Sequence, residues 1–195
     1  MSSNSNRRVS RNHKARQGVL INAVYNTKRK AHFGTLTRNG WFSAAPDDAS
    51  VHRSIRTNNP GAMNDTKWQR GRSGYVGRTA PDAAGNKTTI YRTPEEGVAA
   101  WRYLLTDIYG FGSEGGFTVI DAARRYAGRD ADLAAISAYL KGWKKWSGGA
   151  LSRDTRVSLR RPSDLMVFAQ AVFAHEADVR SPLSEEQIRA GLQLF

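Results

Sequence analysis

Apolar residues in the C-terminal half of the chain recur at helical spacing. The stripe that predicts the first helix comprises Val98, Trp101, Leu105 and Ile108. Thr93, followed by Pro94 and Glu96, has the sequence of an N-cap with a capping box. Gly110 is a typical helix stop. We therefore expect one continuous helix from Pro94 to the residue before Gly110.

Four more helices are predicted from similar signals at their ends. They are a helix capped by Thr118 that runs to about Ala127, one from about Asp130 to Gly142, one capped by Ser163 that runs to about Ala177, and one capped by Ser184 and Gln187 that ends with the chain. The segment 143–162, between the second and third of them, is predicted as a loop that carries two exposed tryptophans.

The N-terminal half has strand-like and irregular patterns instead. Residues 18–25 are apolar and fit either a strand or a helix, whereas residues 33–43 alternate as a hairpin around the turn pair Asn39 and Gly40. Residues 51–92 are rich in Gly, Asn, Thr and Arg and predict irregular structure with short strands, the last at 87–92. The expected fold class is mainly α, in an α+β arrangement with a small β portion.

Composition narrows the class of protein. The chain has 195 residues, of which 39% are hydrophobic, enough for one sizeable core. It has no cysteine, which excludes a disulfide scaffold, a thiol nucleophile and a thiolate zinc site. Its apolar runs are far shorter than the roughly 20 residues that cross a bilayer, and its start has no apolar signal-peptide region. We therefore expect neither a membrane span nor a Sec signal peptide.

Positive charge is concentrated near the N-terminus. The formal net charge is +13, and residues 1–46 contain nine Lys or Arg and no acidic residue. We expect residues 1–16 to form a disordered basic arm, residues 17–50 a short β-hairpin extension and residues 51–195 the main domain. Such an arm would contact a polyanion through salt-sensitive attraction, or would serve only as a solubilising tail.

No metal or cofactor motif is visible in the sequence. The histidines are His13, His32, His52 and His175, and they lack metal-ligand spacing. The chain also has no Walker A, nucleophile-elbow or dinucleotide-binding pattern. We therefore expect neither a metal ion nor a cofactor. What remains is carboxylate chemistry, in which an acid with a raised pKa protonates a leaving group.

Glu176 is the most unusual carboxylate of the chain. On its predicted helix it lies about 20° from Leu165 and about 40° from Val172, on the apolar face. It also lies in the last turn, where the helix dipole disfavours an anion. Burial and dipole would both raise its pKa, as a general acid requires. The alternative is an ion pair with Arg180 or Arg189 that only anchors the chain.

The other carboxylates are weaker candidates. Glu96 faces away from the apolar stripe and is explained by its capping role. Glu95 lies nearer that stripe, and Glu114 lies in a glycine-rich loop. The sequence leaves open whether any of the three assists Glu176.

A second candidate site is the segment 56–63, which reads RTNNPGAM. Pro60 restricts Asn59 to extended conformations, and Gly61 permits a sharp reversal. The two carboxamides could therefore point rigidly at a neutral polar ligand such as a sugar. Alternatively, Asn58 and Asn59 satisfy their own turn as Asx-type side chains.

Taken in order, these patterns resemble a known family, the lysozyme-like peptidoglycan-degrading proteins of phage virions and related bacterial proteins. The segments that carry the resemblance are SIRTNNPGAM, WQ, GYVG, YRTPEEGVAAWRYLL, FTVIDAARRYA and FAQAVFAHEADVRSPLSEEQI. They span residues 51–195. The sequence departs at Ala62, where the family usually has Asn, and at Ala177 and Asp178, where Asn-Gly is common. The resemblance implies a lysozyme-like helical domain, and the order of the motifs is consistent with a circular permutation.

The resemblance also implies an activity. The protein would cleave the β-1,4 bond between N-acetylmuramic acid and N-acetylglucosamine in bacterial peptidoglycan, with Glu176 as the general acid. The residues expected along the sugar-binding cleft are Arg56, Asn58, Asn59, Tyr75 and Tyr91. Because no convincing partner carboxylate for Glu176 is found, a lytic transglycosylase is favoured over a two-carboxylate muramidase.

Two other classes stay open at this point. A nucleic-acid-binding virion structural protein would use the basic arm, although the main domain has no established groove-reading motif. A non-catalytic cell-wall-binding module is compatible with the departures at Ala62 and Ala177. For the favoured enzyme we expect a monomer, virion-associated or delivered to the bacterial periplasm, with peptidoglycan as its partner.

Overall fold

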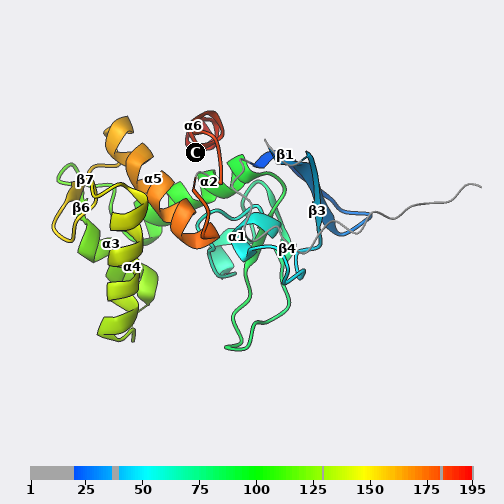
Figure 1. Cartoon of the computed structure of the whole chain (residues 1–195), viewed down its shortest axis with the longest axis horizontal. Coiled ribbons are helices and arrows are strands. Elements are labelled where there is room, and N and C mark those ends of the chain that lie inside the picture. The colour runs from blue at the N-terminus through cyan, green and yellow to red at the C-terminus, as the bar shows by residue number, and fades with distance from the viewer. Residues whose placement is uncertain (1–19, 37–39, 129, 181, 195) are drawn as a thin grey trace, which may run out of the picture.

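The computed structural model describes residues 20–36, 40–128, 130–180 and 182–194. The helices in this part of the chain are α1 (Arg53–Arg56), α2 (Pro94–Tyr103), α3 (Val119–Ala127), α4 (Leu133–Trp146), α5 (Pro162–Ala177) and α6 (Glu185–Gln193), with a 3₁₀ turn at Lys67–Gln69 and a π-helical turn at Leu104–Ile108. The described strands pair into three small antiparallel sheets. This mixture is of the α+β class expected from the sequence (Figure 1).

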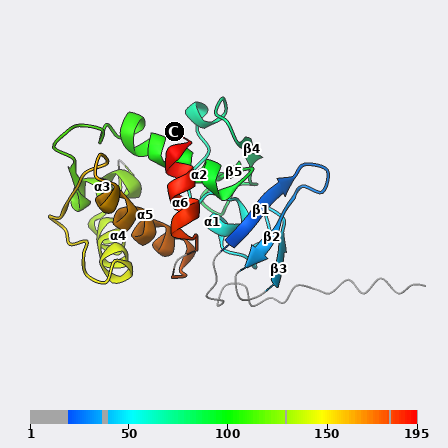
Figure 2. The same ribbon diagram turned by 90° about the horizontal axis from the view of Figure 1, so that it is seen from above.

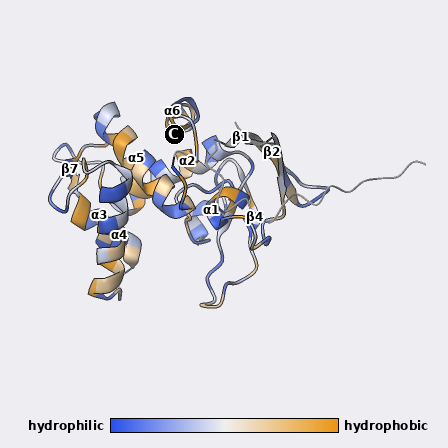
Figure 3. Cartoon of the chain, viewed as in Figure 1, coloured by the Kyte–Doolittle hydropathy of each residue, from blue (hydrophilic) through white to orange (hydrophobic). Residues whose placement is uncertain are grey.

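The α5 helix is the centre of the helical part. Its buried residues are Leu165, Met166, Phe168, Ala169, Ala171, Val172, Phe173, Ala174 and Ala177. Because these positions fall on every side of the helix, α5 is a core helix rather than a surface one. It lies between α4 and α6, and α6 in turn packs against α2 (Figures 1 and 2). Figure 3 shows the hydrophobic stretches of α4 and α5 and the hydrophilic ones of the surrounding loops.

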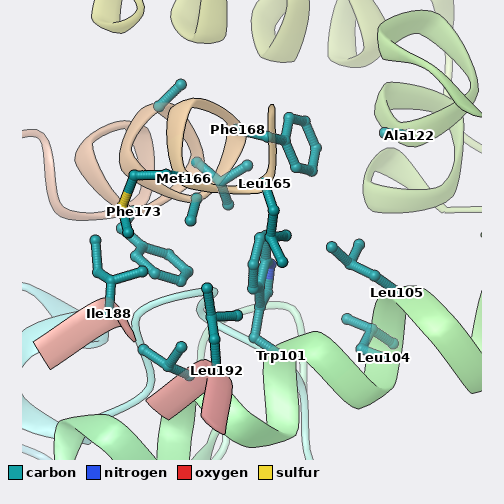
Figure 4. Close-up of a cluster of buried hydrophobic side chains, with 14 of the residues drawn as sticks. Trp101, Leu104, Leu105, Ala122, Leu165, Met166, Phe168, Phe173, Ile188 and Leu192 are labelled. Carbon is teal, nitrogen blue, oxygen red and sulfur yellow. The ribbon is translucent and has the colours of Figure 1, made fainter. Parts of the chain in front are cut away.

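Aromatic rings join these helices in one core. Trp101 of α2 points toward α5 (Figure 4), where its ring centroid lies 4.9 Å from that of Phe173 and 6.0 Å from that of Phe168. Trp143 of α4 meets Phe168 edge-on at 5.2 Å and is fully buried. The prediction of two exposed tryptophans is therefore wrong for Trp143, and Trp146 is half-buried.

Capping side chains mark most of the expected helix starts. Thr93, Thr118 and Ser184 each accept a backbone N–H in the first turn of their helix, which confirms these N-caps. Ser163 is not a cap, because α5 already begins at Pro162. Proline is well suited to a first helical position, since it has no N–H to leave unpaired there.

The α4 helix continues beyond its predicted end at Gly142 and includes Trp143 and Trp146. Gly142 marks a close contact with α5 rather than a helix end. A Cβ at this position would lie 2.1 Å from Nδ1 of His175. The missing side chain lets the two helices approach closely. The helix therefore continues through Gly142, and the predicted loop begins only at Ser147.

The first predicted helix changes its winding before it ends. The α2 helix is regular to Tyr103, and Leu104–Ile108 continue it as a π-helical turn. In this turn the amide of Tyr109 donates to the carbonyl oxygen of Leu104 (2.8 Å). A π turn accommodates one extra residue and rotates the side chains that follow it. Ile108 is accordingly exposed, although the apolar stripe predicted it as buried.

The predicted hairpin is confirmed as β2 (Ala31–Leu36) paired antiparallel with β3 (Gly40–Ala44), although Asn39 in its turn lies outside the described residues. The ambiguous segment before it is a strand, β1 (Leu20–Asn26), which pairs with β2. This sheet lies at the opposite end of the molecule from α3 and α4 (Figure 2). Its contacts with the main domain include a hydrogen bond from the Tyr25 amide to the Arg92 carbonyl oxygen (2.9 Å).

Two smaller strand pairs connect the irregular segments. β4 (Tyr75–Arg78) pairs with β5 (Thr89–Tyr91), as the predicted short strands of residues 51–92 require. β6 (Phe117–Thr118) pairs with β7 (Arg156–Val157), a pairing that the sequence did not indicate. Within the described residues no helix is long and apolar enough to span a membrane. The predicted basic arm, residues 1–16, lies outside the described part.

We expect Gly142→Ala to lower the free energy of unfolding by about 1–3 kcal/mol, because the added methyl group would overlap the His175 ring. The loss should occur although alanine is the better helix former. Gly71→Ala is the control, since a Cβ there meets nothing within 4 Å. Urea denaturation measures both variants. Equal stabilities would contradict the close approach of α4 and α5.

Candidate active site

A cleft of about 380 Å³ lies where α1 and its following loop meet the π turn and the ends of α3 and α5. Its lining residues are Arg53, Gly61, Ala62, Met63, Asn64, Thr66, Trp68, Leu104, Ile108, Tyr109, Arg125, Tyr126, Ala127, Gly128, Tyr139 and Glu176. The size falls within the range of about 300–1,000 Å³ that is usual for ligand sites. Segments distant in the sequence thus form one concave surface.

Glu176 lines this cleft from the last turn of α5. Its main chain is held in place, because Ser54 Oγ donates to the Glu176 carbonyl oxygen (3.1 Å). Burial of the carboxyl group raises its pKa to about 7, and the positive charge of Arg53 opposes part of that rise. Near neutral pH the group therefore exchanges between its acid and base forms, as acid–base catalysis requires. The position and the raised pKa both agree with the expectation for Glu176.

The alternative expected for Glu176, an anchoring ion pair with Arg180 or Arg189, is not found. Arg189 instead pairs with Glu185 on α6 (Nη2–Oε2 3.5 Å). Among the described residues, no Lys or Arg nitrogen lies within 4.0 Å of the Glu176 carboxyl oxygens. The cation that influences Glu176, Arg53, has its own partner in Asp82 (3.3 Å). The carboxyl group therefore keeps its raised pKa.

Tyr109, Tyr126 and Tyr139 line the cleft together with Glu176. Burial raises the pKa of Tyr109 to about 12 and raises that of Tyr126 and Tyr139 further, and the Glu176 charge adds to the rise in each case. All three are thus neutral phenols at any physiological pH. Their rings pack in a row, with centroid distances of 5.9 Å and 5.7 Å between neighbours. The indole N–H of Trp101 donates to the Tyr126 hydroxyl and fixes the middle ring.

The loop 61–64 and Trp68 form another part of the cleft wall. Gly61 lies directly on α2, because a Cβ there would be 2.5 Å from Cδ1 of Trp101. Trp68 packs against Tyr103, with ring centroids 5.3 Å apart, and the guanidinium carbon of Arg72 lies 3.5 Å from the Tyr103 centroid. These contacts fix the Trp68 indole while one side of it lines the cleft.

Asn58 and Asn59 are buried inside the fold, so the expectation that they line the cleft does not fit the structure. Asn58 Nδ2 donates to the carbonyl oxygens of Ala23 (3.1 Å) and Arg92 (3.0 Å). Asn59 Nδ2 donates to those of Met63 (2.9 Å) and Thr89 (3.0 Å), while its Oδ1 accepts the Met63 amide (3.0 Å). Asn59 therefore holds the loop at Met63 through local bonds, close to the Asx-type alternative, whereas Asn58 joins its turn to segments that are distant in the sequence.

Arg56, Tyr75 and Tyr91 also lie outside the cleft lining, contrary to expectation. Arg56 Nη1 donates to the carbonyl oxygens of Asp48 (3.0 Å) and Val51 (2.8 Å). Tyr75 donates to Asp65 (3.2 Å). Tyr91 is fully buried, with Gln69 as its hydroxyl partner (3.3 Å). The sequence showed which residues are polar or aromatic, but not on which side of the loop they lie.

Glu176 is the one carboxylate among the described residues that line the cleft. Glu96 closes the capping box with Thr93, as expected (Oε2 to the Thr93 amide, 3.1 Å). Glu114 is exposed and pairs with Arg160 (2.9 Å). Glu95 is half-buried on α2, outside the cleft lining. None of these three is placed to assist Glu176 directly.

Sequence reasoning missed most of the cleft. Tyr109 lies one residue before Gly110 and Tyr126 two residues before Gly128, the glycines that mark helix ends, and this placement was the available signal. Arg53 directly precedes the segment that was singled out, but nothing in its surroundings distinguished it from Arg56.

Two of the three residues that depart from the resembled family, Ala62 and Asp178, lie at left-handed backbone positions, whereas Ala177 ends the α5 helix. Ala62 has φ of 48° and Asp178, the C-cap of α5, has φ of 47°. Asn and Gly adopt this conformation with the least strain. Asn at position 62 and Gly at position 178, which are usual in the resembled family, would therefore suit the backbone of this chain. Ala62 also lines the cleft.

Comparisons with known proteins gave no match, either to a protein-family model or to a curated protein sequence. Within the described part of the chain, no group of three or more His, Asp or Glu side chains is placed to hold a metal ion.

We expect Glu176→Gln to raise the free energy of unfolding by roughly 1–3 kcal/mol near pH 8 and to leave it unchanged near pH 4. The folded protein holds the carboxyl group at a pKa of about 7, against an ordinary value of 4.5. A raised folded-state pKa favours the folded state only while the group is protonated, so wild-type stability falls as pH rises between these two values. Denaturation across this pH range measures the difference.

The control for this measurement is Glu186→Gln, on the exposed side of α6, which should show no such pH dependence. A stability difference that stays constant between acid and alkaline pH would contradict the burial of the Glu176 carboxyl group.

Proposed function

We propose that this protein is a peptidoglycan-cleaving glycosidase that acts on the β-1,4 bond between N-acetylmuramic acid and N-acetylglucosamine. The observation that carries the proposal is the carboxyl group of Glu176, which lines a ligand-sized cleft and has a pKa raised to about 7. A carboxylic acid protonated near neutral pH is the group needed to cleave a glycosidic bond.

In this mechanism Glu176 donates its proton to the glycosidic oxygen as the bond from that oxygen to the anomeric carbon breaks. The 6-hydroxyl group of the N-acetylmuramic acid then attacks the anomeric carbon and closes a 1,6-anhydro ring. The Glu176 carboxylate accepts the proton of that hydroxyl group and is regenerated as the acid. A pKa of about 7 suits both steps, because neither form of the carboxyl group is strongly favoured at neutral pH.

The presence of one carboxylate in the described lining supports a lytic transglycosylase over a muramidase. A hydrolase of the two-carboxylate type needs a second acid, about 5 Å away when configuration is retained or up to about 9.5 Å away when it is inverted. A transglycosylase has no such need, because the nucleophile belongs to the substrate.

The rest of the lining suits a saccharide. Tyr109, Tyr126 and Tyr139 offer apolar ring surface with neutral hydroxyl groups, and Asn64 and Thr66 add polar side chains. Aromatic walls with a few polar groups are typical of small-ligand sites. Because Trp101 fixes Tyr126 and Tyr103 supports Trp68, these walls are organised before the substrate arrives.

The cleft arrangement also supports the proposed lysozyme-like, circularly permuted domain over residues 51–195. The loop that follows Asn59 and the late residue Glu176 line the same cleft, although they are far apart in the chain. Five of the six segments that carry the family resemblance, all except GYVG, contribute residues to this lining. Peptidoglycan as partner, a monomeric state and delivery within a virion or to the periplasm belong to the same proposal.

Glu176→Gln should lower the rate of peptidoglycan solubilisation by at least about 100-fold, because the glutamine amide cannot protonate the glycosidic oxygen. Glu114→Gln is the control, since Glu114 is exposed and paired with Arg160 outside the cleft (2.9 Å). Zymography and turbidity measure the rates, and mass spectrometry of released muropeptides identifies the product. Anhydro ends are expected, and hydrated reducing ends would identify a muramidase. Full activity of Glu176→Gln would rule out its role.

The pH dependence of kcat/KM should fall above a pH of about 7, where Glu176 loses its proton. Arg53→Gln should move this alkaline limb to higher pH, because the Arg53 charge lowers the pKa of Glu176. Arg189→Gln, which removes the same charge from α6, should leave the limb unchanged. An alkaline limb that does not respond to Arg53→Gln would mean that another group titrates.

A further inference from the structure

A second cavity, of about 570 Å³, borders the Glu176 cleft. It lies between α3, the start of α4 and the loop before α3. Apolar side chains of Phe111, Phe117 and Ile136 form part of its lining. Arg125 and Gly128 line both this cavity and the Glu176 cleft, so the two meet at the C-terminal end of α3.

Arg125 is held at this junction by Tyr109. The Tyr109 hydroxyl group donates to the Arg125 carbonyl oxygen (3.4 Å), and the guanidinium carbon lies 6.0 Å from the centroid of the Tyr109 ring. The side chain is nevertheless exposed to solvent in the cavity. A cation placed against an aromatic ring is oriented without losing its free donors.

Arg125 differs from its neighbours in having no ion-pair partner among the described residues, although Asp121 lines the same cavity. Arg124 has Asp121 as a partner at 3.8 Å, and Arg53 has Asp82 at 3.3 Å. Within the described residues, no carboxylate oxygen lies within 4.0 Å of the Arg125 guanidinium. Its five N–H donors are therefore free to receive an anion, and arginine binds a carboxylate in bidentate geometry.

We propose that Arg125 binds a carboxylate of the peptide stem that peptidoglycan carries on N-acetylmuramic acid, and that the second cavity accommodates that stem. The inference rests on the proposed function, because it assigns the sugars to the Glu176 cleft. A stem attached to a sugar in the Glu176 cleft extends away from the glycan strand. The second cavity adjoins that cleft at Arg125, which lines both. Its lining combines apolar side chains with Arg125, while the other charged lining residues, Arg124 and Asp121, pair with each other at 3.8 Å. Such a lining suits a short peptide that ends in carboxylates.

This assignment makes the protein selective for peptide-bearing glycan. A strand without stems carries only the short lactyl carboxylates next to its sugar rings, so it would fill the Glu176 cleft, leave the second cavity empty and provide no stem carboxylate for Arg125. Selectivity would then arise from an interaction made outside the reacting sugars, where binding energy can add to the stabilisation of the transition state.

The test compares two forms of one substrate, glycan strands with intact stems and strands whose stems an amidase has removed. Arg125→Gln should lower kcat/KM about tenfold on stem-bearing glycan and less than about twofold on stem-free glycan. Arg125→Lys should recover part of the loss, because lysine keeps the charge but not the bidentate geometry. Arg189→Gln, a paired surface arginine on α6, should behave as wild type. Equal losses on both substrates, or no loss on either, would overturn the assignment.

A binding measurement decides the assignment separately from turnover. In the Glu176→Gln background, co-sedimentation should show tighter binding to sacculi with free stem carboxylates than to sacculi whose carboxylates have been amidated, and Arg125→Gln should abolish the difference. Stem-dependent binding without any cleavage by the wild-type protein would overturn the proposed activity and keep the role of Arg125. Cleavage with stem-independent binding would keep the activity and overturn the role of Arg125.

Discussion

Burial of α5 is the constraint on which both the core and the cleft depend. Apolar residues on every side of this helix fix it between α4 and α6, so its last turn has one position in the fold. Glu176 is part of that turn, and partial burial of its carboxyl group beside the cleft raises the pKa of that group. Packing of the apolar core thus also determines the pKa of this acid. The free-energy cost of burying one carboxyl group is offset by the burial of the apolar side chains around it.

In the loop that follows α1, some residues hold the backbone in place and others line the cleft. Asn58 and Asn59 bind backbone groups inside the fold, and Gly97 leaves room for them, since a Cβ there would lie 2.0 Å from the Asn58 carbonyl oxygen. The segment that follows, from Gly61 to Asn64, reaches the cleft. The most distinctive motif of the sequence therefore specifies loop geometry, and its neighbours supply the surface.

Local sequence rules were sufficient to predict many of the helices and strands and to place Glu176 on the apolar face of its helix. Caps such as Thr118 depend on a few adjacent residues, and the helical period alone places Glu176 beside Leu165. Gly142 shows where such rules fail, because the reason for a glycine there lies on another helix, at His175. The cleft likewise depends on contacts between segments that are distant in the sequence. Its wall joins residues from five separate segments, and no pattern within one segment records which faces meet.

The π-helical turn at Leu104–Ile108 constrains the length of the chain at the cleft. Its extra residue sets the direction of everything up to the start of α3, including Tyr109 and hence the anchor of Arg125. Removing one residue would allow regular α-helix, but would turn Tyr109 by about 100° about the helix axis, away from the other two tyrosines. Related chains with this cleft should therefore vary here by exchange of side chains and keep the residue spacing constant.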